Sequence, residues 1–333
     1  MTEYRIGICS WTDRSLLSEG EFYPARSMSA EERLRYYATV FDTVEVDSSY
    51  YALPSARNAG LWVERTPPGF LFNVKAYALM TGHHPRADSL PADLRAMLPA
   101  APKATPRGEI ERSAFPPEAL DRCFTLFRES LRPLAEADRL GYVLFQFAPW
   151  IRFSESALAY LATLSDRLPG WMVAVEFRDQ SWIPGHTRDV LDTLTKAKLA
   201  LVCVDAPETP NAIPRVVEVT ADTAILRLHG RNAAGWLAQL RGEGPSVREK
   251  YDYLYREEEL VELVGEARIL GRNAKRIFIV FNNNNRDYPA VNAAQVLRLL
   301  GKPLPDFETL KAQWKSVRPR RGTGKDLPRG LFN

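Results

Sequence analysis

The sequence predicts a closed (β/α)8 barrel, the TIM-barrel fold, and three observations support this prediction. Eight short runs rich in β-branched and aromatic residues recur along the 333 residues, which is typical of strands. Most of these runs are followed by an amphipathic helical pattern. The runs are apolar almost throughout, as expected of parallel strands that are covered on both faces. Eight alternating units favour a closed barrel, and a doubly wound open sheet is the alternative.

The predicted elements follow one another in a regular order, with two irregular units. Strands are expected at residues 5–11, 43–50, 70–76, 142–147, 172–177, 200–205, 224–230 and 276–283. Helices are expected at residues 30–41, 120–139, 155–168, 188–197, 250–270 and 289–300. Residues 81–117, after the third strand, form a long proline-rich insertion, and residues 207–222, after the sixth strand, lack a helical pattern. Residues 1–305 are predicted to form a single domain, and residues 306–333 a basic tail.

The overall composition excludes several classes of protein. A chain that is 45% hydrophobic and 26% charged is neither disordered nor collagen-like nor a coiled coil. No apolar run approaches the roughly 18 residues that a membrane span requires. The three scattered cysteines, Cys9, Cys123 and Cys203, form neither a disulfide framework nor a zinc motif, and they fit a reducing compartment. The N-terminus shows no basic and apolar leader, so the sequence predicts a cytoplasmic protein without membrane contact.

The charge distribution along the chain is uneven. The net charge is only +3, but from Lys311 onward seven basic residues accompany one acidic residue. Such a tail has two interpretations: it contacts the phosphates of a nucleic acid, or it is a solvated terminus.

Polar side chains fall on one parity of nearly every predicted strand, mostly in its C-terminal half. Because residues two apart share one side of a strand, Glu176 shares its side with Arg178. The other polar residues of this interior set are Glu45, Asp47, Asn73, Lys75, Gln146, Asp205, Arg227, His229, Asn282 and Asn283. Charges inside a barrel need an explanation, and the C-terminal mouth is where such barrels bind their ligands. The set therefore predicts a ligand site, and buried ion pairs that only hold the barrel together are the alternative.

A series of short motifs recurs in order between residues 4 and 300. They are Ile6-Gly7-Ile8-Cys9-Ser10-Trp11, Phe22-Tyr23-Pro24, Val44-Glu45-Val46-Asp47-Ser48-Ser49-Tyr50-Tyr51, Phe72-Asn73-Val74-Lys75-Ala76, Phe145-Gln146-Phe147-Ala148-Pro149, Val175-Glu176-Phe177-Arg178, Ser181-Trp182, Arg227-Leu228-His229-Gly230 and Phe281-Asn282-Asn283. Together they resemble the YecE-like family, also called domain of unknown function 72. The resemblance implies a TIM barrel distantly similar to those of sugar isomerases and apurinic-site endonucleases, and it implies no established activity.

The sequence departs from the family pattern in two places. Asp47 stands where the family typically has asparagine, which adds a negative charge at the mouth. The family's Thr-His becomes Thr81-Gly82-His83-His84, so either His83 or His84 corresponds to the family histidine.

The residue types at the mouth limit the chemistry. Only His229 of the four histidines ends a predicted strand, which argues against a multi-zinc site of the endonuclease kind. A single Mg²⁺ or Mn²⁺ held by Glu176, Asp205 and Asp47 stays open, because hard cations prefer oxygen ligands. The alternative is that these acids pair with neighbouring basic residues. Walker, Rossmann and nucleophile-elbow motifs are absent from the sequence.

The leading hypothesis is an enzyme that acts at the mouth on an anionic, hydroxyl-rich ligand. This ligand is a phosphoester of a sugar, a nucleotide or a nucleic acid, and hydrolysis is the expected reaction. His229 and Glu176 would carry the acid–base work, and Lys75 would hold the anion or act as a Schiff-base nucleophile. The predicted ligand-binding residues are Trp11, Asp47, Tyr50, Gln146, Arg178, Asp205, Arg227, Asn282 and Asn283. A non-catalytic barrel that binds nucleic acid or another ligand, and an acid–base enzyme like the sugar-phosphate isomerases, are the alternatives.

Overall fold

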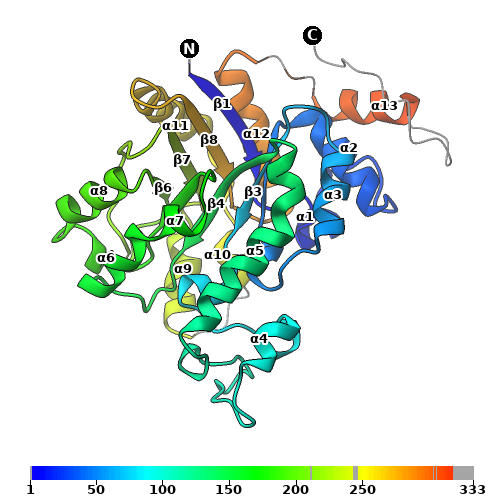
Figure 1. Cartoon of the computed structure of the whole chain (residues 1–333). Helices are drawn as coiled ribbons and strands as arrows, with labels where there is room; N and C mark the ends of the chain where they lie inside the picture. Colours follow the sequence, from blue (N-terminus) through cyan, green and yellow to red (C-terminus); the bar gives the residue numbers. More distant parts are fainter. Residues whose placement is uncertain (1, 211, 243–246, 303, 305, 318–333) are drawn as a thin grey trace.

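Eight parallel strands surrounded by helices form a nearly closed barrel, as predicted (Figure 1). The computed structural model describes residues 2–210, 212–242, 247–302, 304 and 306–317. The strands are β1 (Glu3–Ile8), β2 (Thr43–Val46), β3 (Leu71–Lys75), β4 (Leu140–Gln146), β5 (Val173–Glu176), β6 (Ala200–Asp205), β7 (Thr223–Leu228) and β8 (Arg276–Phe281). They hydrogen-bond in the order β1-β8-β7-β6-β5-β4-β3-β2, each pair in parallel.

The barrel closes where β1 meets β2. Cys9 forms an isolated parallel bridge with Glu45, and the Ser10 backbone N–H donates to the Glu45 carbonyl at 2.9 Å. The two strands approach so closely that a Cβ atom on Gly7 would lie 2.1 Å from the carbonyl oxygen of Thr43. Glycine is therefore required here for steric reasons.

Most of the strands end earlier than the sequence predicts. The β2 prediction ran to Tyr50, but Ser48–Tyr50 form a 3₁₀ turn instead. The predicted and observed bounds of β6 agree.

The surrounding helices match the predicted pattern with several differences. They are α2 (Ala30–Val40), α3 (Ala56–Glu64), α5 (Glu118–Glu136), α6 (Glu155–Ala162), α7 (Leu164–Arg167), α8 (Thr187–Lys196), α9 (Ala233–Leu240), α10 (Val247–Lys250), α11 (Glu257–Leu270) and α12 (Tyr288–Leu299). A capping box begins α2, since the Ser29 hydroxyl accepts from the Glu32 backbone N–H and the Glu32 carboxylate accepts from that of Ser29. The helix expected at residues 155–168 is split into α6 and α7, and α3 and α9 were not predicted.

The barrel interior is apolar at its N-terminal end and polar towards the C-terminal mouth. Along β4, Tyr142 and Leu144 belong to the inner apolar cluster, and the polar Gln146 follows them on the same parity. Along β8, Phe278 and Val280 belong to the same cluster. The mouth therefore opens onto a polar layer that rests on an apolar floor.

The two irregular units lie where the sequence places them. Residues 81–117 project beyond the ends of the strands and contain the short helix α4 (Ala92–Ala96) and two isolated antiparallel bridges (Figure 1). In the part of 206–222 that the structure describes there is no helix.

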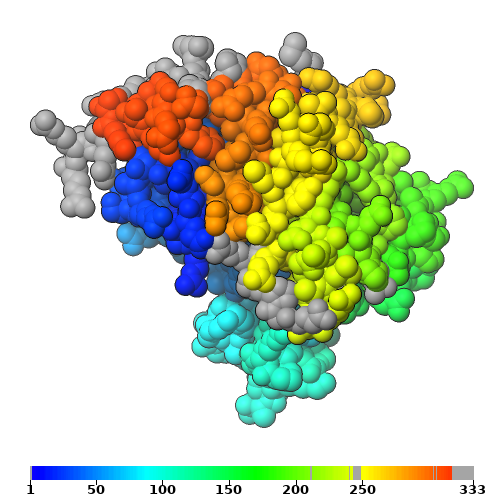
Figure 2. All heavy atoms as spheres, turned by 180° about the vertical axis from the view of Figure 1, so that it is seen from behind, coloured from blue at the N-terminus to red at the C-terminus, as the bar shows by residue number. Residues whose placement is uncertain are grey.

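Part of the segment predicted as a basic tail belongs to the barrel's outer layer. Helix α13 (Phe307–Val317) lies beside the N-terminal helices (Figure 2), where the Trp314 ring packs 5.5 Å from Tyr36 and the Phe307 ring 5.4 Å from Phe22. The basic residues Arg318, Arg320, Arg321, Lys325 and Arg329 lie outside the described residues. Among the described helices, none has the length and apolar character needed to span a bilayer.

Candidate functional site

Arg227 on β7 is the centre of a buried ion network inside the barrel. Its side chain is 1% exposed, and it lies between two acids that are fully buried, Glu45 and Glu176. Its Nη2 atom lies 2.6 Å from Glu45 Oε1, and its Nη1 atom 2.9 Å from Glu176 Oε2. The Tyr142 hydroxyl donates to the other Glu45 oxygen at 2.9 Å. Glu45, Arg227 and Glu176 thus form a paired set of buried charges beneath the mouth.

Arg178 lies two residues after the end of β5, nearer the mouth. Its Nη2 atom lies 2.6 Å from Glu176 Oε1 and donates to Gln146 Oε1 at 3.1 Å. Its side chain is 14% exposed, so this guanidinium reaches the opening that Arg227 does not. Burial alone would raise the pKa of Glu176, but Arg178 and Arg227 hold it well below its ordinary value. Glu176 is therefore an ionised partner of two arginines.

His229 sits against this pair of arginines and is fully buried. Its Nε2 atom lies 3.3 Å from Arg178 Nη2 and from Arg227 Nη1, and 3.4 Å from Glu176 Oε1. Burial, together with the Arg178 charge, lowers the pKa of His229 to about 3. The ring is therefore neutral at pH 7. On its other side, the ring places Nδ1 2.9 Å from Asn282 Nδ2, so His229 joins the Asn282 amide to the arginines and Glu176.

The buried histidine makes stability dependent on pH. The unfolded chain binds a proton at His229 near the ordinary pKa of 6.5, whereas the folded site resists it down to about 3. The contribution of the neutral His229 ring to the free energy of unfolding is therefore fully present above pH 6.5 and is lost as the pH drops towards 3. Between pH 7 and 5 the parent should lose about 2 kcal/mol more unfolding free energy than a His229→Gln variant, measured by urea denaturation. Equal losses in the two proteins would contradict the buried neutral ring.

Lys75 and Asp47 lie on the opposite side of the mouth, at the ends of β3 and β2. Burial lowers the pKa of Lys75, against the opposing influence of Asp47, and its Nζ lies 4.8 Å from the centre of the Tyr50 ring. Burial raises the pKa of Asp47, whose Oδ1 lies 3.8 Å from Arg227 Nη2 and has no hydrogen-bond partner in the described part of the chain. Lys75 forms no ion pair with any side chain that the structure describes.

His83, not His84, is the histidine at the mouth. Its ring lies 5.0 Å from Tyr50, and burial, with Lys75 and Arg178 nearby, lowers its pKa to about 3. His84 lies in the insertion, and its ring stacks on the half-exposed ring of Trp150, in the loop after β4.

Three predicted ligand-binding residues lie away from this network. Trp11 packs against Trp62 and Phe72, between the barrel and α3. The other two are Asp205, whose carboxylate pairs with Arg231 at 2.8 Å and Arg215 at 2.9 Å, and Asn283, whose Nδ2 donates to the Tyr253 carbonyl. In β6 the interior parity belongs to Val202 and Val204, so Asp205 points to the helix side.

A metal does not fit the residues at the mouth. Because Asp205 points away, the predicted trio of Glu176, Asp205 and Asp47 is not brought together. Among the described residues, the group that could hold an ion is Cys9, Glu45 and Asp47, whose ligand atoms lie within 4.8 Å of one another. The Arg227 guanidinium already lies 2.6 Å from this Glu45 carboxylate and 3.6 Å from Cys9 Sγ. A resident cation there would be repelled at short range.

Sequence reasoning missed a third basic residue at the mouth. Lys250 on α10 places its Nζ 3.7 Å from the centre of the Trp236 ring and 5.3 Å from that of Tyr251. Burial lowers its pKa to about 8, and the Arg178 charge contributes to this shift. The sequence does contain a lysine followed by an aromatic residue, Lys250-Tyr251, after strand seven. Because these residues are not in a strand, strand parity cannot predict where their side chains lie.

Comparison with known proteins gives a consistent result. The model of the family described as "Protein of unknown function DUF72" matches residues 5–315. UPF0759 protein YunF of Bacillus subtilis (strain 168) is 32% identical over 299 residues, which cover 89% of this chain and 94% of that protein.

Solved structures of DUF72 family proteins are also similar. That from Thermotoga maritima MSB8 has 27% identity and a TM-score of 0.69, with 90% of this chain and 99% of that chain covered. That from Enterococcus faecalis V583 has 26% identity and a TM-score of 0.70, with 91% and 98% covered. The resemblance seen in the sequence is confirmed, and the chain belongs to the DUF72 family of proteins of unknown function.

Proposed function

We propose that the protein is an enzyme that binds a phosphoester at the C-terminal mouth of the barrel and hydrolyses it. One observation carries the proposal: the cations Lys75, Arg178 and Lys250 gather around one opening. Arg178 lies close enough to lower the pKa of both lysines. Neither lysine forms an ion pair with a side chain that the structure describes. Such a site is expected to bind a ligand with two negative charges most tightly.

The same cations suit the chemistry of phosphoryl transfer. Charge on the non-bridging oxygens is stabilised by fixed positive groups, and Arg178 is fixed by Glu176 and Gln146. Lys250, with a pKa of about 8, is suited to give a proton to the leaving oxygen while water attacks phosphorus. A bound anion also offsets the Arg178 charge, which raises the pKa of His229 back towards its ordinary value.

The test is phosphate binding and phosphoester turnover by the parent and by two lysine variants. Phosphate should raise the melting temperature of the parent. Lys75→Gln and Lys250→Gln should each weaken phosphate binding about tenfold, the usual effect of losing one charged hydrogen bond. Lys196→Gln, on the exposed surface of α8, is the matched control and should bind like the parent.

The outcomes separate the proposal from its alternatives. Hydrolysis of p-nitrophenyl phosphate or of sugar phosphates that is lost in Lys250→Gln supports the enzyme. Phosphate binding without turnover of any phosphoester supports the non-catalytic barrel. If phosphate stabilises neither the parent nor the variants, there is no anion site.

A further inference from the structure

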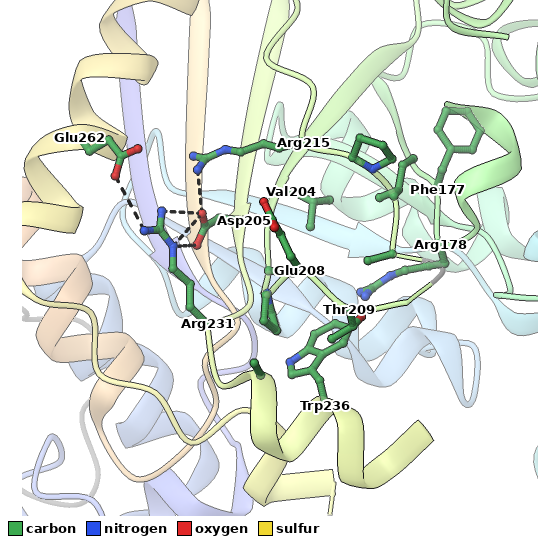
Figure 3. Close-up of a pocket in the computed structure, with 16 residues that line it drawn as sticks. Phe177, Arg178, Val204, Asp205, Glu208, Thr209, Arg215, Arg231, Trp236 and Glu262 are labelled. Carbon is green, nitrogen blue, oxygen red and sulfur yellow. Dashed lines mark hydrogen bonds and ion pairs between the residues drawn. The ribbon is translucent and has the colours of Figure 1, made fainter. Parts of the chain in front are cut away.

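A cavity of about 910 Å³ lies beside the mouth, against Arg178 (Figure 3). The ends of β5 and β6, the segment that follows β6, and α9 form its walls. This volume lies in the range of sites that hold small ligands. Because Arg178 also reaches the ion network of the mouth, one ligand can contact both spaces at once.

One side of the cavity carries donors that have no acceptor. Arg178 Nε and Trp236 Nε1 are buried, and neither has a hydrogen-bond partner among the residues that the structure describes. Figure 3 shows Arg178, Thr209 and Trp236 gathered on the same side of the cavity. Buried donors without partners cost free energy, so a ligand oxygen placed here would recover it.

The segment after β6 adds groups that accept. Glu208 lines the cavity and forms no ion pair with the side chains that the structure describes, and the Thr209 hydroxyl both donates and accepts. The opposite side is different, because the charges there are already paired: Asp205 with Arg215 and Arg231. Unpaired donors and the Thr209 hydroxyl therefore lie together near Arg178, and Figure 3 shows Glu208 between them and the paired charges.

We propose that this cavity holds the sugar ring of a phosphorylated sugar whose phosphate lies on Arg178; the inference rests on the proposed function. Ring hydroxyls both donate and accept, which matches Trp236 Nε1, Thr209 and Glu208. A flat nucleobase fits less well, because Lys250 Nζ lies 3.7 Å from the Trp236 ring centre and covers one stacking face.

The experiment compares affinities by calorimetry for inorganic phosphate, glucose 6-phosphate, ribose 5-phosphate and adenosine 5′-monophosphate. The parent should bind at least one sugar phosphate about tenfold more tightly than inorganic phosphate, as expected for one or two added hydrogen bonds. Trp236→Phe removes the donor and keeps a ring, and Glu208→Gln removes the charge. Each substitution should weaken binding of that sugar phosphate by about five- to tenfold, while the affinity for inorganic phosphate stays within about twofold of the parent's.

Glu218→Gln is the matched control, since Glu218 is an exposed acid on the same segment and does not line the cavity. It should bind every probe like the parent. Equal affinity of the parent for phosphate and all sugar phosphates would overturn the cavity assignment and leave the anion site standing. The cavity assignment is also overturned if the two variants lower the affinities for phosphate and for sugar phosphate by the same factor. Tightest binding of the nucleotide would overturn the sugar ring, and no binding of any probe would overturn the proposed function as well.

Discussion

Replacing Arg227 by methionine is expected to lower the free energy of unfolding by about 3–5 kcal/mol. The reason is that Glu45 and Glu176 are both fully buried and share this guanidinium. Glu176 keeps Arg178 as a partner, whereas Glu45 is left without an ion pair among the described side chains. Urea denaturation at pH 7 measures the loss.

Two further variants make the Arg227 result interpretable. Arg132→Ala removes an arginine of a surface pair whose members are each 70% exposed, and it should change stability by less than about 1 kcal/mol. Adding Glu45→Gln to Arg227→Met removes the stranded charge, so the double variant should be more stable than Arg227→Met alone. A loss for Arg227→Met no greater than that for Arg132→Ala would contradict the buried network.

Changing Arg178 to alanine is expected to weaken phosphate binding by about 1.5–3 kcal/mol, because it removes a charged hydrogen bond to the anion. Folding should suffer less than in Arg227→Met. The Arg178 side chain is partly exposed, so water can replace it, and Glu176 stays paired with Arg227. Calorimetric titration with phosphate measures the affinity, and urea denaturation measures the stability.

The matched control for Arg178 is Arg152→Ala, which removes a 75% exposed arginine from the loop after β4. It should change neither quantity. If Arg178→Ala is as unstable as Arg227→Met, and phosphate stabilises neither the parent nor the variant, the polar interior is purely structural.

The sequence was informative wherever strand parity continues without interruption. Glu176 with Arg178, and Arg227 with His229, were placed together because residues two apart share one side of a strand. Parity failed for Asp205, which ends β6 on the helix side, because the interior positions of that strand are filled by valines.

Lys250 and Trp236 could not be placed from the sequence. They belong to α10 and α9, and the path of the chain between β7 and β8 depends on tertiary packing rather than on a local pattern. By contrast, strand parity places Arg178 nearer the opening than Glu176, and the structure agrees, with Arg178 14% exposed and Arg227 1% exposed.

The buried network consists of charges that alternate in sign: Glu45, Arg227, Glu176 and then Arg178, each within 2.9 Å of the next. An alternating series that begins with an acid and has four members must end with a base. The sign of the charge offered to a ligand is therefore fixed by the length of the series as much as by the residue at its outer end. Shortening the series by one member would leave Glu176 at its outer end, and Lys75 and Lys250 would then be the cations that remain at the opening.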